Sequence, residues 1–166
     1  MDDGIARMGD VVFSRPDLTA LRALGLGSCI GLCVFDPVIK LACIAHIVLP
    51  QAKLAGASDN GKYADTAVPY VIKEMCAKGA VKSRLRIAIA GGAQLFAFGN
   101  GEDRLNVGKR NTEAVKQLLA QERVKLVAED VGGNSGRTVV LDATTGDVIV
   151  KQAGSGEKLL ANLGYR

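Results

Sequence analysis

The chain has 166 residues, 48% of them hydrophobic and 23% charged, which suits one domain with a substantial core and argues against disorder. Its formal net charge of +4 comes from scattered Lys and Arg residues with few aromatics, a pattern that argues against a nucleic-acid partner. No apolar run approaches the roughly 18 residues of a membrane span, and the start M-D-D-G lacks the apolar region of a signal peptide. We therefore expect a cytoplasmic, single-domain protein over residues 1–166, with a core at about 10–151 and a C-terminal tail at 152–166.

The first half of the chain alternates apolar runs with turn signals. Three strands are predicted, one short and two longer, over 10–13, 23–35 and 40–49. Asp36 and Pro37 favour a turn over residues 36–39, so the two longer strands are predicted to form a β-hairpin. The polar run 51–62 is predicted to be an exposed loop.

The rest of the chain, from residue 63 on, contains two segments with apolar residues at helical spacing, and four further strands are predicted there. The helices are predicted over 66–78, capped by Asp65 or Thr66, and over 109–121, capped near Asn106. The strands are predicted over 85–90, 125–129, 138–142 and 147–151, with the last two forming a hairpin. Together these elements predict a mixed sheet packed on helices, in an α/β or α+β sandwich.

The four cysteines, at positions 29, 33, 43 and 76, are expected to be free thiols, because cytoplasmic proteins rarely carry disulfides. The spacing of Cys29 and Cys33 does not match a zinc site, since no second cysteine pair follows and the chain has one histidine. We expect neither a metal nor a cofactor.

The single histidine, His46, falls on the second strand of the predicted hairpin. If residues 36–39 form the loop, His46 lies directly opposite Cys29 on one face of the sheet. A register shifted by two residues would make them diagonal neighbours on that face, and a shift of one would separate them. Cys33 is predicted on the same face but nearer the turn, and Cys43 on the other face.

A cysteine beside an imidazole suggests nucleophilic chemistry, because the imidazole can take the thiol proton. The backbone N–H groups of Gly27, Ser28 and Cys29 could bind the oxyanion that forms on an attacked carbonyl, and the glycines around Cys29 would leave room for a substrate amide. Spacing alone leaves a second interpretation equally open, in which the cysteines are small core residues and His46 is a core histidine with satisfied hydrogen bonds.

Two further motifs each have a structural and a functional interpretation. The turn Gly91–Ala93 follows a predicted strand, and it is either a tight turn or a loop that borders the site. The run Asn106–Asn111 opens a helix, where helix capping with a solvated basic turn is favoured over a phosphate site.

Motifs spread over most of the chain resemble those of the chemoreceptor glutamine deamidases, the CheD family. They are L-G-L-G-S-C-I-G-L-C-V-F-D followed by H-I-V-L-P, then K-Y-A-D-T-A, G-G-A-Q-L-F, N-V-G-K-R-N and D-V-G-G-N-S-G-R, within roughly residues 10–150. The resemblance implies an α/β/α sandwich with a largely antiparallel sheet, Cys29 as nucleophile and His46 as general base. The implied enzyme is a cysteine-dependent protein-glutamine amidohydrolase that converts glutamines of methyl-accepting chemotaxis receptors to glutamates, through a thioester and with release of ammonia.

One position departs from the family pattern. The family carries a threonine six positions before the nucleophile, where it orients the histidine, whereas this chain has Ala23. Thr19, Ser28 or a backbone carbonyl could replace it. The departure keeps open a weakly active or inactive regulatory partner of a CheC-type phosphatase that acts on phosphorylated CheY. A cysteine peptidase or transglutaminase is a third interpretation, since both use thioester chemistry.

Overall fold

The computed structural model describes residues 3–52, 60–95 and 106–164. Within these ranges the chain forms nine strands, two α-helices and one 3-10 turn at Lys82–Arg84. The strands and helices are, in chain order, β1 (Val11–Phe13), β2 (Ala20–Leu26), β3 (Ile30–Asp36), β4 (Leu41–Ile47), α1 (Ala64–Ala77), β5 (Arg86–Gly91), α2 (Val107–Glu122), β6 (Lys125–Val131), β7 (Arg137–Asp142), β8 (Asp147–Gln152) and β9 (Gly156–Asn162).

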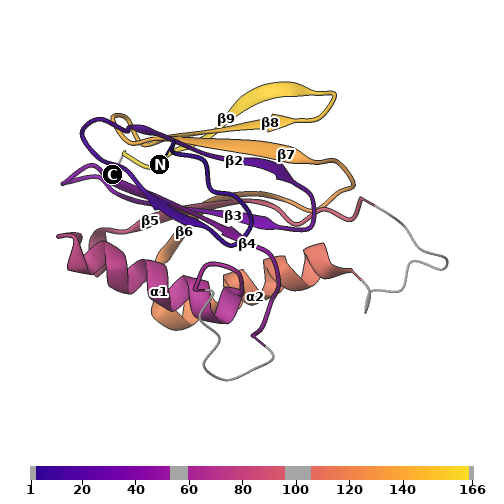
Figure 1. The fold of residues 1–166 in the computed structure, drawn as a ribbon, viewed down its shortest axis with the longest axis horizontal. Coiled ribbons are helices and arrows are strands. Elements are labelled where there is room, and N and C mark those ends of the chain that lie inside the picture. Colours follow the sequence, from indigo (N-terminus) through magenta and orange to yellow (C-terminus); the bar gives the residue numbers. More distant parts are fainter. Residues whose placement is uncertain (1–2, 53–59, 96–105, 165–166) are drawn as a thin grey trace.

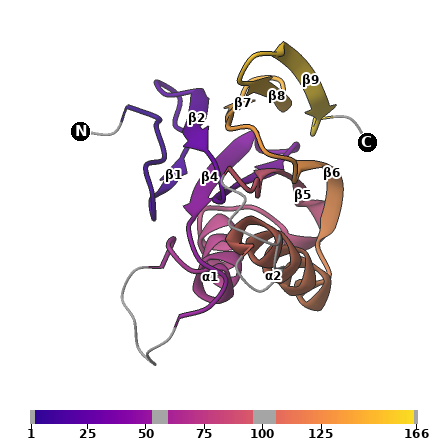
Figure 2. The ribbon, with the colours of Figure 1, turned by 90° about the vertical axis from the view of Figure 1, so that its right-hand side faces the viewer.

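These elements stack in three layers (Figure 1). The first sheet has the strand order β1-β4-β3-β5-β6, and the second has the order β2-β7-β8-β9. Both helices cover one face of the first sheet, and the second sheet covers its other face (Figure 2). The predicted mixed α/β fold with largely antiparallel strands is confirmed, since among the strands of the described residues β5 and β6 alone form a parallel pair, apart from two isolated parallel bridges. The order of layers is helices, sheet, sheet rather than α/β/α, because β2 and the three C-terminal strands form a sheet where a second helix layer was expected.

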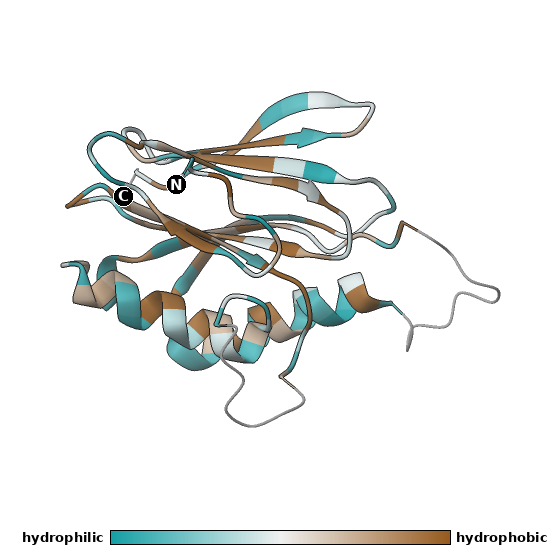
Figure 3. Ribbon diagram, viewed as in Figure 1, coloured by the Kyte–Doolittle hydropathy of each residue, from teal (hydrophilic) through white to brown (hydrophobic). Residues whose placement is uncertain are grey.

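Two hydrophobic cores follow from this stacking, one between the first sheet and the helices and one between the two sheets. Strand β3 contributes to both, and all seven of its residues are buried. A strand that is covered on both faces needs apolar side chains at every position, which explains the uninterrupted apolar run there. The hydropathy colouring shows such runs along the first sheet, while the helices alternate between apolar and polar residues (Figure 3).

The segment 23–35, predicted to be one strand, is divided into β2 and β3. Residues Gly27–Cys29 form a bend between them. Strand β2 pairs with β7 in the second sheet, with an irregularity between Ala23 and Leu26, and β3 pairs with β4 and β5 in the first. Leu26, before the bend, and Cys29, at its end, face the core between the sheets, and Ile30 faces the core beneath the helices, so no change in the apolar pattern marks the break. The bend therefore carries the chain from one sheet to the other.

The hairpin of β3 and β4 is confirmed, but its loop is residues 37–40 rather than 36–39. Asp36 stays in β3 and pairs with Leu41 because its fully buried carboxylate has partners there. The carboxylate accepts hydrogen bonds from the backbone N–H groups of Val38 and Val81 and pairs with the guanidinium of Arg84 at 2.9 Å. The register is thus shifted by two residues from the predicted one.

The remaining predicted elements are observed with small changes. Helix α2 begins after Asn106, whose side chain caps it by accepting from the N–H of Lys109, as expected. Helix α1 begins after Tyr63, which makes no side-chain cap, so the predicted cap at Asp65 or Thr66 is wrong. The segment 152–166, treated as a tail, supplies strand β9, and most of the predicted loop 51–62 lies outside the described residues.

The buried Asp36 carboxylate is expected to stabilise the fold strongly. Burial alone would raise the pKa of Asp36, but hydrogen bonds from Arg84 and two backbone N–H groups outweigh it and hold the pKa below the ordinary 3.8. Asp36→Asn should lower the free energy of unfolding by about 2–3 kcal/mol at pH 7, measured in urea. Because the folded-state pKa is lowered, this advantage of the wild type is present above pH 3.8 and disappears as the pH falls through the folded-state pKa.

Asp17→Asn is the matched control for that measurement. Asp17 also pairs with an arginine, at 3.2 Å from Arg15, but its side chain is 78% exposed. Its replacement should change the free energy of unfolding by less than about 0.5 kcal/mol. Equal effects of the two substitutions would contradict the assigned role of Asp36.

Candidate active site

Cys29 lies in the bend between β2 and β3, at the edge of the core between the two sheets. Its side chain is 7% exposed, and burial raises the pKa of its thiol above the ordinary 9.0. Cys33 faces the same core with no exposure, and Cys43 faces the core beneath the helices, as predicted. All four cysteines are free, and Cys76 is exposed on α1. Cys29 is therefore the one thiol that combines a position in a bend with residual access to solvent.

The bend has an ordered set of backbone contacts. The carbonyl of Gly27 accepts from the N–H of Ala93 at 2.8 Å, and the carbonyl of Cys29 accepts from the N–H of Gly92 at 2.9 Å. The carbonyl of Ser28 accepts from the side chain of Asn111 at 2.9 Å. In the described part of the chain, no acceptor is assigned to the N–H groups of Gly27, Ser28 or Cys29. A segment with occupied carbonyls and free N–H groups has the donors that an oxyanion site requires.

His46 lies on β4, is 3% exposed, and pairs across the hairpin with Gly31. The prediction that it lies directly opposite Cys29 is therefore wrong. Cys29 is two residues before Gly31, so the shift of two preserves a shared face, and diagonal neighbours in regular strands lie about 7–8 Å apart. Both side chains belong to the space between the sheets.

The glycines near Cys29 do not all leave open space. A Cβ on Gly31 would lie 2.9 Å from a methyl of Val139, and a Cβ on Gly27 would lie 2.8 Å from the side chain of Leu95. Gly31 therefore serves the close packing of the second sheet, and Gly27 is covered by a half-exposed leucine. Gly25, with a φ of +62°, is the one of the three for which no atom of the described chain lies within 4 Å of a Cβ placed there.

The imidazole of His46 is held by the backbone. Its Nδ1 lies 2.8 Å from the carbonyl oxygen of Ala6, and since a carbonyl only accepts, Nδ1 carries the proton and donates it. Nε2 then has a free lone pair, and this buried nitrogen has no hydrogen-bond partner among the described residues. A histidine with a purely structural role would be expected to satisfy both ring nitrogens. In the neutral imidazole this arrangement leaves Nε2 as an acceptor with a fixed tautomer.

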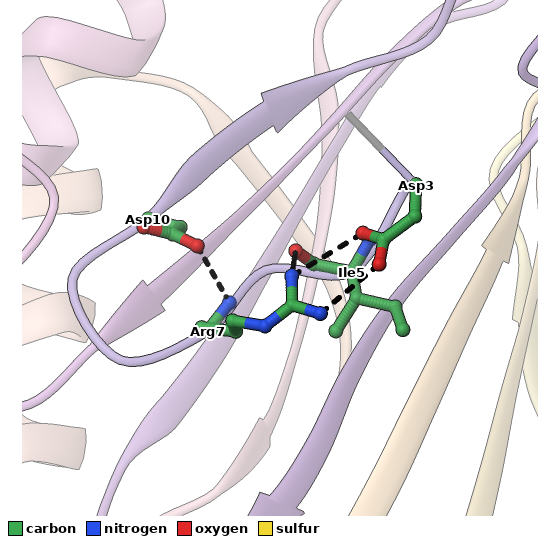
Figure 4. A network of polar contacts seen from close by, with 4 residues as sticks. All are labelled: Asp3, Ile5, Arg7 and Asp10. Atoms are coloured by element: carbon green, nitrogen blue, oxygen red, sulfur yellow. Dashed lines mark hydrogen bonds and ion pairs between the residues drawn. The ribbon is translucent and has the colours of Figure 1, made fainter. Parts of the chain in front are cut away.

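The segment that supplies this carbonyl, residues 3–10, is here called the N-terminal strap. Its Ala6 N–H donates to the carbonyl of Arg22 at 2.7 Å, and its Gly9 N–H donates to the carbonyl of His46 at 2.9 Å. The strap thus connects β2 to β4. Within it, Arg7 forms an ion pair with Asp3 at 3.0 Å and its N–H donates to Asp10 (Figure 4). These contacts fix Ala6 beside the imidazole.

The strap bears directly on the departure at Ala23. Ala23 is fully buried on β2, in the same core as Cys29. Of the three replacements considered for the family threonine, the structure has a backbone carbonyl at Nδ1, that of Ala6, rather than Thr19 or Ser28. His46 is therefore oriented without a hydroxyl at position 23.

Asn111 was not predicted to contribute to this site. It lies on α2 with no exposure, and its amide reaches both the bend and the end of β4. A signal was present in the sequence, since Asn111 shares the apolar stripe of Val115 and Leu119 at intervals of four residues. The turn Gly91–Ala93 also borders the site, through its two bonds to the bend.

Other features of the described residues lie away from Cys29 and His46. A hollow of about 480 Å³, lined by residues such as Ser14, Lys40 and Lys78, lies at the opposite end of β3. Within residues 3–52, 60–95 and 106–164, no group of three or more His, Cys, Asp or Glu side chains is placed to hold a metal ion. No helix of the described chain has the length and apolar character needed to cross a membrane.

The rate at which Cys29 is alkylated is expected to depend on pH, because burial raises the pKa of its thiol. Because burial raises its pKa above the ordinary 9.0, the free thiol should be almost entirely protonated at pH 7. Alkylation by iodoacetamide should therefore rise with pH through pH 9 without levelling off near neutrality. The measurement uses a Cys76→Ser background and site-resolved peptide mass. A plateau below pH 7 would contradict it and indicate a preformed thiolate–imidazolium pair.

Similarity to known proteins establishes the family. A family model described as "CheD chemotactic sensory transduction" matches residues 48–152. A protein of Syntrophomonas wolfei named "Probable chemoreceptor glutamine deamidase CheD" is 49% identical over 141 residues, which are 84% of this chain and 88% of the relative. The chain belongs to the CheD family. The resemblance noted in the sequence is thereby confirmed.

Other members of the CheD family give the same result. A Clostridium botulinum protein of the same name is 46% identical over 137 residues, 82% of this chain and 85% of the relative. A Symbiobacterium thermophilum protein of that name is 43% identical over 148 residues, 88% and 89% of the two chains.

Among solved structures, the Bacillus licheniformis hypothetical protein YfiH matches with a TM-score of 0.47 and 14% identity, over 75% of this chain and 49% of that one. The CheD family model begins at residue 48, so the assignment of Cys29 and His46 depends on their geometry.

Proposed function

We propose that this chain is a protein-glutamine deamidase that converts glutamine side chains of chemotaxis receptors to glutamate. The proposal combines membership of the CheD family with one observation, the unpartnered and buried Nε2 of His46 on the face that Cys29 shares. An acceptor nitrogen with a fixed tautomer, on the same face of the sheet as a thiol, suits a general base for a cysteine nucleophile.

In the first half-reaction, Nε2 of His46 takes the proton of the Cys29 thiol as Sγ attacks the side-chain amide carbon of the substrate. The negative charge that develops on the amide oxygen is stabilised by the free N–H groups of the bend. The protonated His46 then gives its proton to the departing nitrogen. The carbon–nitrogen bond breaks, ammonia leaves, and a thioester remains on Cys29.

In the second half-reaction, Nε2 takes a proton from water, which attacks the thioester carbonyl. The carbon–sulfur bond breaks, the proton returns to Sγ, and the product is a glutamate side chain. Throughout, the hydrogen bond from Nδ1 to Ala6 stabilises the imidazolium that forms transiently. The buried, neutral thiol fits a mechanism in which the proton leaves during attack rather than beforehand.

The partners of this reaction are the cytoplasmic regions of methyl-accepting receptors, so the protein is proposed to act in the cytoplasm. The alternative, an inactive regulator bound to a CheC-type phosphatase, was motivated by Ala23. Ala23 is a weaker reason for that alternative because the carbonyl oxygen of Ala6 already accepts a hydrogen bond from Nδ1 of His46.

The test incubates the wild-type protein with a receptor cytoplasmic fragment and follows ammonia release together with glutamine-to-glutamate conversion by peptide mass. Stoichiometric ammonia and glutamate are expected. Incorporation of an added amine instead of water would indicate a transglutaminase, and cleavage of the fragment would indicate a peptidase. Tight binding to a phosphatase partner without any deamidation would support the regulatory alternative.

A further inference from the structure

The side chain of Asn111 connects the nucleophile bend to the strand that carries the base. Its Nδ2 donates one hydrogen bond to the carbonyl of Ser28 and another to the carbonyl of Val48, both at 2.9 Å. Ser28 directly precedes Cys29, and Val48 is two residues beyond His46. One amide therefore links the residue before Cys29 to the segment that follows the His46 strand.

The orientation of this amide is fixed by its surroundings. Both protons of Nδ2 are used, and a flipped amide would place Oδ1 against two carbonyl oxygens, which cannot donate to it. In the observed orientation Oδ1 is buried and has no hydrogen-bond partner within residues 3–52, 60–95 and 106–164. A fully buried asparagine that leaves its acceptor unsatisfied, in order to donate twice, marks a position where the two donors matter.

The other contacts of the bend show why Asn111 is decisive. The carbonyls on either side of Ser28 are held by backbone N–H groups of the turn Gly91–Ala93, which no side-chain substitution removes. Ser28 alone depends on a side chain. Helix α2 can deliver that side chain because Gly108 packs directly on the same turn, where a Cβ would collide with the carbonyl oxygens of Gly92 and Ala93.

We propose that Asn111 is a positioning residue for the deamidation reaction. It sets the Cys29 bend relative to the His46 strand, so that the N–H groups of the bend and the thiol meet the substrate amide in register with Nε2. This role rests on the proposed function. A misplacement of catalytic groups by about 1 Å costs roughly 10²-fold in rate, so the effect should appear in kcat and not in KM.

The test uses Asn111→Asp and Asn111→Ala in a Cys76→Ser background. Asn111→Asp keeps the size of the side chain but removes both donors, so both variants should lose about 10- to 100-fold in kcat, with KM within threefold of wild type. Val115→Ala is the matched control, because Val115 lies one turn further along the buried stripe of α2 and has no bond to the bend. It should keep kcat within threefold per folded molecule.

Alkylation of the buried cysteines gives a readout that does not require activity. Loosening of the bend should expose Cys29, so both Asn111 variants should be alkylated there about 3- to 10-fold faster, while kcat falls. Cys33 and Cys43, which have no exposure, should stay protected. Alkylation of all three cysteines at raised rates would mean a general loss of structure and would overturn the proposal, as would unchanged kcat and unchanged Cys29 alkylation.

Two further outcomes are also decisive. If Asn111→Asp and Asn111→Ala do not fold, Asn111→Ser, which keeps one hydroxyl donor, is measured instead. It should also lower kcat and speed the alkylation of Cys29 alone, both by smaller factors. If neither kcat nor the alkylation of Cys29 changes, the proposal is overturned. If the wild type does not deamidate a receptor fragment, the proposed function fails, and selective alkylation of Cys29 alone then decides whether Asn111 holds the bend.

Discussion

Cys29→Ala is expected to lower kcat/KM for receptor deamidation by about 10⁴-fold or more, since no thioester can form without the sulfur. The substitution removes one mostly buried atom at the edge of a core, so the free energy of unfolding should change by no more than about 1 kcal/mol. The activity is measured as ammonia release from a receptor cytoplasmic fragment, and the stability by urea unfolding.

Cys33→Ala is the control for this experiment. Cys33 faces the same core as Cys29 but has no exposure, so a substrate cannot reach its sulfur, and burial also raises its pKa to about 12. Its replacement should lower stability by about 1 kcal/mol and leave kcat/KM within threefold per folded molecule. Comparable losses of activity in the two variants would mean that the core, not a particular thiol, supports the reaction.

His46→Asn is expected to lower kcat/KM by about 10²- to 10⁴-fold, the usual contribution of a general acid–base group. Asparagine can place an amide N–H where Nδ1 now lies, so the bond to the carbonyl of Ala6 can be kept while the base is lost. Stability should change by no more than about 1 kcal/mol, because the nitrogen that is removed is the one without a partner. Steady-state kinetics and urea unfolding measure the two quantities.

His46→Ala extends this comparison because it also removes the bond to Ala6. It should be as inactive as His46→Asn but less stable, by about 1–2 kcal/mol. An active His46→Asn variant, or one that is strongly destabilised, would favour the interpretation of His46 as a core histidine.

The sequence predicts those parts of the site that depend on strand periodicity. Side chains alternate with a period of two, so Cys29 and His46 stay on one face in the predicted register and in the observed register, which is shifted by two. The shift itself could not be predicted, because it follows from the burial of Asp36 against Arg84 and Val81, which lie far along the chain.

The break between β2 and β3 could not be predicted from the sequence either, because the apolar pattern does not change there. Both strands face the same core between the sheets, so the apolar pattern continues across the bend even though the hydrogen-bond partners change. The orienting carbonyl of Ala6 leaves no trace in the sequence either, since every residue has a carbonyl and only tertiary structure places one against Nδ1. Asn111, by contrast, was visible as a polar residue in an apolar helix stripe.

The structure also changes the interpretation of Ala23, the position that departs from the family pattern. A missing hydroxyl at position 23 suggested an unsupported base. The N-terminal strap supplies the support from another part of the chain, and it does so with a group that point substitutions of side chains do not remove. Activity is therefore expected in spite of Ala23.

The most direct test of the central claim is the mass of the enzyme during turnover. The wild-type protein is mixed with a receptor cytoplasmic fragment, quenched in acid at short times and digested for peptide mass. A transient adduct is expected on Cys29, with the added mass of the glutamine-containing peptide less ammonia, and it should be absent from Cys29→Ala. Deamidation that proceeds in Cys29→Ala, or an adduct carried by another residue, would contradict it.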